Sequence, residues 1–319
     1  MHLPKVPTPS LRLDINRRML LAGLAAIVLT AACSARGGTS SDGTGNPEAL
    51  DVVATTSVLA DLVQQAGGSH VAASSLVPPG GEVHTFDPTP ADIARVADAD
   101  LIVTNGLGLD DWVADLARDS GTRAPVVVLG EELDGVTYLA GDGPEGTVNP
   151  HLWMDVGNAI RYAVRIGDEL AKVDPANAEA YGSSTKAYTQ GLTELDGWAR
   201  DQIAAIPEAR RKVVSFHDAL PYFAEAYGLE IVGTVIDAPG QDPSAGEIAD
   251  LIEAIRAAGA TALFGEAQFN PELARTIAEE TGITVVTDLY TDSLGDPPAD
   301  SYEGLIRWDV DKVVEALQP

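Results

Sequence analysis

The stretch DPANAEAYGSSTKAYTQGLTELDGWARDQIAAIP, residues 174–207, decides the fold that the sequence predicts. Its apolar residues recur mostly at steps of three and four, the spacing of one face of an α-helix. These residues are Tyr181, Tyr188, Leu192, Leu195, Trp198 and Ile203. Gly182, Gly191 and Gly197 lower the helix propensity of the stretch. We nevertheless expect one long rigid helix, which would limit hinge opening between any two lobes that it joins.

Short β-branched runs alternate with helix-like segments on both sides of this helix. Such βα alternation predicts two α/β lobes, each with a parallel sheet covered by helices. Strands are expected in residues 51–56, 71–77, 100–105, 124–130, 211–216, 229–236, 260–265 and 283–289. Helices are expected in residues 57–68, 89–99, 218–228, 243–259, 270–282 and 302–317. We expect Ser57 to cap the first of these helices and Gly67 or Gly68 to end it.

The sequence therefore divides into an N-terminal lobe (residues 51–173), the linking helix (174–207) and a C-terminal lobe (208–319). Residues 1–32 are set apart as a predicted signal peptide, because a basic segment precedes the short apolar run LLAGLAAIVLTAA. Small residues directly before Cys33 resemble the lipobox at which bacterial lipoproteins are cut and acylated. Residues 33–50 are rich in Gly, Ser and Thr and predict a flexible tether between the lipid and the first lobe.

Two alternatives for this N-terminal segment stay open. It is also compatible with an ordinary secretory signal in which Cys33 is incidental. The arginine pair in NRRMLL, residues 16–21, faintly resembles a twin-arginine export signal.

The composition excludes some classes of partner and of site. The formal net charge is −28, with 48 acidic and 20 basic residues, so the protein is expected to repel nucleic acids and anionic lipids. Most of these acids are expected to form a solvated exterior. Cys33 is the only cysteine, which rules out a disulfide within the chain and a cluster of thiolate metal ligands.

Three histidines share a similar setting. His84 lies in the turn-rich stretch PPGGEVHTFDPTP (residues 78–90), His151 in NPHLWMD and His217 in SFHDAL. Each has an acid within four residues, whereas His70 lacks this setting and is interpreted as a surface residue. Their wide separation matches no local metal motif. On spacing alone, loop histidines that are hydrogen-bonded to nearby acids are the better interpretation.

Five blocks of sequence resemble, in order and spacing, the zinc- and manganese-binding lipoproteins of bacterial ABC importers. They are LVPPGGEVHTFDPTPADI, NPHLWMDV, VVSFHDALPYFAEAYGLEIVG, LFGEAQFNPELARTIAEETG and LYTDSLG. The resemblance implies two lobes joined by one long helix, with the metal in the cleft between the lobes. It also implies four metal ligands: His84 and His151 from the first lobe, and His217 and Asp292 from the second. Asp288 is the competing candidate for the carboxylate.

The implied ligand set favours Zn²⁺, because imidazole suits zinc and one carboxylate lowers the charge of the enclosed ion. Metal affinity should then fall below about pH 6.5, because protonated imidazole cannot bind. Asp87, Asp155 and Asp218 are candidate partners of the ligating imidazoles, and Glu266 is a candidate for hydrogen bonding across the cleft. The acid-containing loop 130–149 has no histidine, unlike the histidine-rich loop of many zinc-binding relatives.

The function that the resemblance implies is a monomeric, lipid-anchored receptor on the extracytoplasmic face of the membrane. It would capture Zn²⁺ and deliver it to an ABC transporter permease, without being an enzyme. The chain has no phosphate-binding G-x-x-x-x-G-K-[ST] loop, which agrees with ATP hydrolysis by separate subunits. The alternatives are a manganese receptor of the same family, a zinc-dependent hydrolase and a surface adhesin. No hydrolase motif in the sequence supports the zinc-dependent hydrolase.

Overall fold

The computed structural model describes residues 49–141, 146–236 and 239–318, all within a compact unit that spans residues 45–319. Strands in this part of the chain form two four-stranded sheets, and every pairing within them is parallel. The first sheet contains β1 (Leu50–Ala54), β2 (Val71–Ser75), β3 (Leu101–Thr104) and β4 (Val126–Val128). The second contains β5 (Lys212–Ser215), β6 (Glu230–Thr234), β7 (Ala262–Glu266) and β8 (Thr284–Leu289). The predicted fold of two parallel-sheet lobes is confirmed.

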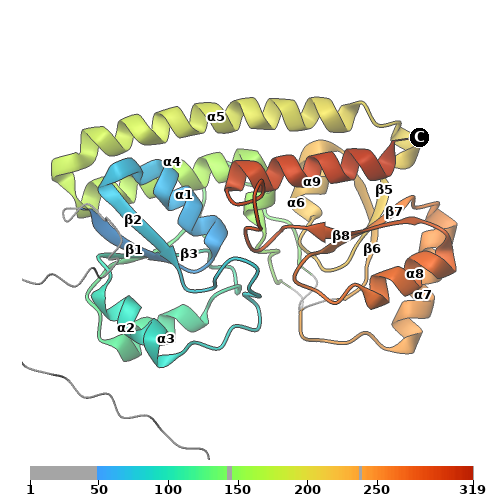
Figure 1. Cartoon of the computed structure of the whole chain (residues 1–319), viewed down its shortest axis with the longest axis horizontal. Coiled ribbons are helices and arrows are strands. Elements are labelled where there is room, and N and C mark those ends of the chain that lie inside the picture. The colour runs from blue at the N-terminus through green and yellow to red at the C-terminus, as the bar shows by residue number, and fades with distance from the viewer. Residues whose placement is uncertain (1–48, 142–145, 237–238, 319) are drawn as a thin grey trace, which may run out of the picture. The chain divides into compact units, whose positions relative to one another are not determined.

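Helices cover both faces of each sheet (Figure 1). The first lobe contains α1 (Ser57–Gly67), α2 (Pro90–Asp98), α3 (Trp112–Ser120) and α4 (Val156–Val173). The second contains α6 (Pro221–Tyr227), α7 (Ala245–Ala258), α8 (Glu272–Thr281) and α9 (Tyr302–Leu317). Successive strand residues point to opposite faces, so Val52 packs in a different apolar cluster from Val53, and Val213 in a different one from Val214.

The strand orders are β2-β1-β3-β4 and β6-β5-β7-β8, so the two lobes repeat one topology. In each sheet the chain first steps to one side and then crosses to the other, which creates a switch point between β1 and β3 and between β5 and β7. Open α/β sheets bind ligands beyond the carboxyl ends of their strands at such points. The loops at these strand ends are therefore the place to look for the functional site.

The linking helix is α5 (Ala178–Ala204), one uninterrupted helix of 27 residues. It contacts α1 and α4 of the first lobe and α6 and α9 of the second, and Figure 1 shows it running along both lobes. Its buried side chains include Tyr181, Leu192, Leu195 and Ile203, as the apolar spacing predicts. They belong to an apolar cluster that also includes residues of both sheets, which favours a rigid connection.

The three glycines of α5 do not interrupt the helix, because they lie on its exposed side. A Cβ atom at Gly182, Gly191 or Gly197 would have no atom within 4 Å. We expect each of these glycines, when changed to alanine, to raise the free energy of unfolding by up to about 1 kcal/mol. Chemical denaturation of the metal-free protein measures this gain. Gly167→Ala on α4 is the opposite control, since its Cβ would overlap the side chain of Thr185, and equal effects from all four variants would contradict this explanation.

Three sequence expectations need correction. The side chain of Thr56, not Ser57, caps α1 by accepting a hydrogen bond from the Leu59 amide at 3.2 Å. Ser57 instead accepts a hydrogen bond from the Leu294 amide in the second lobe, at 2.9 Å.

Helices α3 and α4 were not among the expected elements. The start of α3 is hard to predict because it follows a glycine-rich turn. Helix α4 has a regular apolar face, and its periodicity is detectable over its 18 residues.

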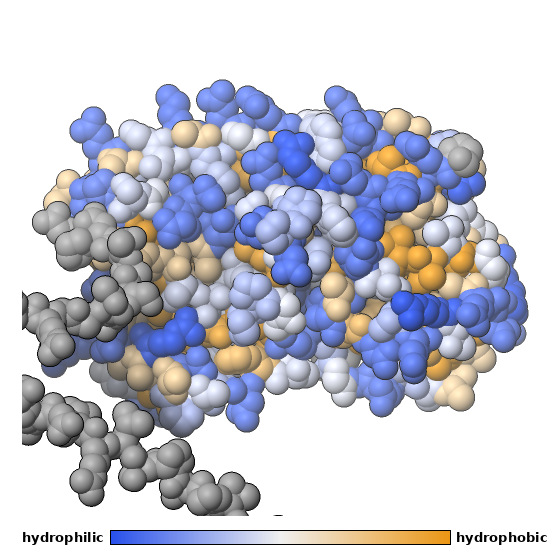
Figure 2. Space-filling model, viewed as in Figure 1, coloured by the Kyte–Doolittle hydropathy of each residue, from blue (hydrophilic) through white to orange (hydrophobic). Residues whose placement is uncertain are grey.

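The surface is largely polar. Figure 2 shows hydrophilic residues across most of the visible face, with smaller hydrophobic areas between them. Within the described part of the chain, only Val126, Tyr138 and Val164 are large apolar residues with high exposure. No helix in that part is long and apolar enough to span a bilayer. The predicted signal peptide, Cys33 and nearly all of the predicted tether lie outside the described residues.

Candidate metal centre

Four side chains meet between the two lobes. His84 lies in the loop between β2 and α2, and His151 directly precedes the short 3₁₀ turn Leu152–Met154. His217 follows the end of β5, and Asp292 follows the end of β8. All four residues therefore lie in loops, two from each lobe. This is the combination of residues that the resemblance implies as ligands.

The ligand atoms converge on one small volume. One nitrogen from each histidine and one oxygen from Asp292 all lie within 4.8 Å of one another. The Nε2 atoms of His84 and His217 are 3.5 and 3.4 Å from Oδ2 of Asp292, and Nε2 of His151 is 3.4 Å from Oδ1. Zinc bonds of about 2.0–2.2 Å in a tetrahedron would place neighbouring ligands about 3.3–3.6 Å apart. The observed spacing therefore has room for one such ion.

Burial of this cluster destabilises the folded protein unless the cluster holds a cation. Asp292 is 0% exposed, and neither of its carboxylate oxygens accepts a hydrogen bond from any described residue. The Nε2 atom of His217 is likewise buried without a hydrogen-bond partner in the described structure. A buried carboxylate without donors loses its hydration without compensation, unless a positive charge replaces the water. The cluster has the properties of a cation site in which the ligands themselves enclose the ion.

Hydrogen bonds outside the cluster orient two of the imidazoles. Nδ1 of His151 lies 3.0 Å from Oδ1 of Asn149, and Nδ1 of His217 lies 2.8 Å from Oε1 of Glu266. Because amide and carboxylate oxygens accept hydrogen bonds, each Nδ1 carries the proton and leaves the Nε2 lone pair directed into the cluster. Both imidazoles are therefore held in the tautomer that a metal requires.

The candidate outer residues differ in their roles. Glu266 bonds His217 within the second lobe, so it orients one imidazole and does not join the lobes as expected. Asp155 caps α4, Asp87 is exposed, and Asp218 accepts from the side chain of Asn149 at 2.8 Å. Asp288, the competing ligand candidate, is outside the cluster and forms an ion pair with Lys312 at 2.7 Å. His70 is also outside the cluster.

Asn149 was missed in the sequence. The sequence feature that could have indicated its role is its position two residues before His151, because an asparagine there can accept hydrogen bonds from the following backbone and ring. Its Oδ1 atom accepts from both the backbone amide and the ring of His151, at 3.0 Å in each case.

The pKa values differ sharply among these groups in the absence of a metal. Burial lowers the pKa of His151 to about 3. Burial also opposes protonation of His217, but the carboxylates of Glu266 and Asp292 outweigh it and raise the pKa of His217 well above 6.5. Burial opposes ionisation of Asp292, yet the neighbouring histidines hold its pKa well below 3.8. The two carboxylates therefore favour the protonated form of His217 when no metal is present, and a bound metal would replace the proton on Nε2.

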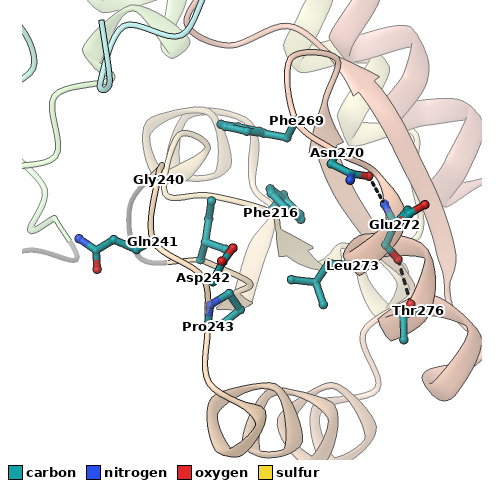
Figure 3. A pocket seen from close by; sticks show the side chains of 11 residues that line it. Phe216, Gly240, Gln241, Asp242, Pro243, Phe269, Asn270, Glu272, Leu273 and Thr276 are labelled. Carbon is teal, nitrogen blue, oxygen red and sulfur yellow. Dashed lines mark hydrogen bonds between the residues drawn. The ribbon is translucent and has the colours of Figure 1, made fainter. Parts of the chain in front are cut away.

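A pocket in the second lobe is a separate feature. It has a volume of about 450 Å³ and opens beside β5, β6 and β7, with Phe216, Phe269 and Leu273 among its lining residues (Figure 3). The ring of Phe269 stands 5.3 Å from the ring of His217, so this pocket neighbours the cluster without containing it.

Comparison with known proteins identifies the family. The family described as "Zinc-uptake complex component A periplasmic" matches residues 52–316. The chain belongs to this family. The manganese-binding lipoprotein MntA of Halalkalibacterium halodurans is 32% identical over 293 residues, which cover 91% of this chain and 95% of that protein. The iron ABC transporter substrate-binding lipoprotein MtsA of Streptococcus pyogenes is 30% identical over 94% of this chain and 97% of its own length.

Solved structures of family members have the same fold. The periplasmic zinc-binding protein TroA of Treponema pallidum superposes with a TM-score of 0.77 at 26% identity, over 85% of this chain and 100% of TroA. A manganese-bound periplasmic metal-binding protein of Candidatus Liberibacter asiaticus gives a TM-score of 0.76 at 26% identity, over 84% of this chain and 99% of that protein. The family consists of solute receptors of transporters, not enzymes. Its members are named for three different metals, so family membership leaves the metal open.

Proposed function

We propose that this protein is the receptor of an ABC metal importer, and that it captures Zn²⁺ with His84, His151, His217 and Asp292. The single observation that carries the proposal is the convergence of these four ligand atoms within 4.8 Å of one another. Two ligands come from each lobe, so an ion between them would fasten the lobes together. Release to the membrane permease would then require the two pairs of ligands to separate.

The ligand set supports capture in preference to catalysis. Four protein ligands complete a tetrahedral shell, whereas catalytic zinc sites keep one position for water or substrate. Three neutral imidazoles and one carboxylate match zinc, and the carboxylate reduces the formal charge of the enclosed ion. The alternative of a zinc-dependent hydrolase would require an open position on the metal, which four protein ligands would not leave.

Manganese is the second candidate, and two observations favour it. A relative that is 32% identical is named as manganese-binding, and both oxygens of Asp292 face histidine nitrogens. A carboxylate that bound through both oxygens would supply more of the oxygen ligation that Mn²⁺ favours. The predominance of nitrogen among the ligand atoms still supports zinc.

Competition between the two metals tests the proposed selectivity. We expect metal-free protein mixed with equal, excess Zn²⁺ and Mn²⁺ to appear in native mass spectra with one bound zinc, because imidazole sites bind Zn²⁺ more tightly than Mn²⁺. Addition of zinc to the manganese-loaded protein should displace manganese. A protein that retains manganese under both conditions would be a manganese receptor, and one that binds neither metal would contradict the proposed function.

Further parts of the proposal concern the protein in the cell. We propose that Cys33 is the lipidated residue after removal of residues 1–32, and that residues 33–50 tether the protein to the extracytoplasmic face of the membrane. We also propose a monomer with lobes at residues 51–173 and 208–319, joined by residues 174–207. Relatives named as lipoproteins support the anchor. The possible roles of the loop 130–149 in attracting cations or covering the site stay predictions, and residues 142–145 lie outside the described structure.

A further inference from the structure

Two side chains that flank His151 make hydrogen bonds to the opposite lobe. Asn149, two residues before His151, donates through Nδ2 to the backbone oxygen of Asp218 at 2.7 Å. Trp153, two residues after His151, donates through Nε1 to the backbone oxygen of Thr291 at 2.8 Å. Both acceptors are direct neighbours of ligands proposed above, because Asp218 follows His217 and Thr291 precedes Asp292.

This arrangement places His151 at the centre of a bracket, defined here as Asn149, His151 and Trp153. One arm of the bracket holds the loop of His217, and the other holds the loop of Asp292. The short turn Leu152–Met154 sets the direction of Trp153 relative to His151, and their rings meet at 5.4 Å with an angle of 62°. Hydrogen bonds from one short segment thus connect the loops of three proposed ligands from two lobes.

The Trp153 arm is enclosed. Trp153 is 1% exposed and Thr291 is 0% exposed, so water cannot replace the indole hydrogen bond without a local opening. The hydroxyl of Tyr302, on α9 of the second lobe, donates to the backbone oxygen of Trp153 at 2.6 Å. Trp153 is therefore bonded to the second lobe through both its side chain and its backbone.

We propose that Trp153 is a positioning residue that slows metal release by holding the Asp292 loop against the segment of His151. This inference rests on the proposed function, because it concerns the same metal site, but Trp153 itself does not touch the metal. Loss of the indole bond would leave the fold and all four ligands in place. The Asp292 loop would keep its bonds to the first lobe at Ser293 and Leu294 but would lose its restraint beside His151, which lowers the barrier to the separation that release requires.

The test compares two matched substitutions, Trp153→Phe and Trp308→Phe. Trp308 donates through its indole to the backbone oxygen of Asp288 at 2.7 Å, a bond of the same type that stays within the second lobe. We expect Trp153→Phe to weaken zinc affinity and accelerate zinc release about tenfold or more, as loss of outer partners of metal ligands typically does. Trp308→Phe should change both quantities less than about twofold.

The readouts are the rate of zinc transfer to a fluorescent chelator, the zinc dissociation constant and the melting temperature of the metal-free protein. A purely structural role of Trp153 would lower the melting temperature and leave zinc release unchanged, which would overturn the inference. Equal effects of both substitutions would also overturn it. Failure of the wild-type protein to bind zinc would instead refute the proposed function.

A measurement on the wild-type protein covers the case in which Trp153→Phe does not fold. The indole N–H of Trp153 should exchange with solvent deuterium slowly in zinc-loaded protein, and faster after the metal is removed by a chelator. The sequence has four tryptophans, so NMR has only four indole N–H signals to assign. Unchanged exchange of the Trp153 signal on metal removal would show that the bond does not respond to the metal, and would overturn the inference.

Discussion

Asp292→Asn is expected to lower zinc affinity more than about 100-fold, which exceeds the typical effect of removing an outer partner. The carboxylate lies within 3.5 Å of a nitrogen from each of the three histidines and has no other donor among the described residues. Asparagine preserves the size of the side chain but removes the negative charge. The ion would then be enclosed by three neutral imidazoles and an amide, which compensates its lost hydration poorly.

Asp288→Asn provides the matched control, since it makes the same chemical change four residues earlier. Asp288 is paired with Lys312 and lies outside the cluster, so its substitution should leave zinc affinity within about twofold. Competition with a chelator of known zinc affinity measures both variants. The histidines provide a parallel comparison, in which His84→Ala should weaken binding severely and His70→Ala should not. A larger effect of Asp288→Asn than of Asp292→Asn would exchange their roles and refute the proposed ligand set.

Zinc affinity is expected to fall by about tenfold for each pH unit below the pKa of His217, because one proton must leave that imidazole when metal binds. Glu266 and Asp292 raise this pKa well above 6.5, so competition by protons begins at a higher pH than the sequence alone predicts. The pKa of His151 is lowered to about 3, and this residue therefore competes for protons only in strong acid. Affinity should thus rise with pH across the neutral range.

Titration calorimetry in buffers of different ionisation enthalpy measures the number of protons released. We expect close to one proton from His217 per zinc ion at neutral pH. Glu266→Gln removes the carboxylate that is 2.8 Å from Nδ1 of His217, so it should lower the pKa of that imidazole and reduce proton release at pH 7. Zinc affinity that does not change between pH 5 and 8 would contradict ligation by His217.

Local patterns in the sequence were sufficient for the two parallel sheets and the linking helix, although α3 and α4 were missed. Apolar spacing along residues 174–207 predicted α5, and β-branched runs predicted strands in both sheets. The start of α3 escaped detection because the preceding turn contains residues with positive φ, including Gly106, Leu107 and Gly108, whose effect on the backbone is not periodic. Local propensity describes one element at a time, and it succeeded for the strands and for α5 because their apolar residues are strongly periodic.

The candidate site was less accessible to such reasoning. His84 and His151 are 67 residues apart, and only tertiary folding brings their Nε2 atoms to 3.4 Å. Their selection as ligands came from resemblance to a family, because their spacing contains no metal motif. The roles of Asn149 and Trp153 were missed altogether. Each depends on a backbone oxygen in the opposite lobe, and no sequence pattern records such a contact.

Metal release is compatible with a long rigid helix between the lobes if it needs only the loops of the site to move. Helix α5 and the shared apolar cluster restrict large hinge motions of the lobes. The four proposed ligands lie in loops outside the strands and long helices, although Leu152 and Trp153 beside His151 belong to the same apolar cluster. We therefore expect release to proceed through displacement of these loops, restrained by the hydrogen bonds of Trp153 and Asn149 and by the bond from the Leu294 amide to Ser57.

The central claim is that His84, His151, His217 and Asp292 jointly hold one metal ion. Anomalous diffraction at the zinc edge from crystals of the zinc-loaded protein tests it most directly. The account predicts a single strong peak between the lobes, about 2.0–2.2 Å from a nitrogen of each histidine and an oxygen of Asp292. A peak elsewhere, or an ion there that lacks any of these four ligands, would contradict it.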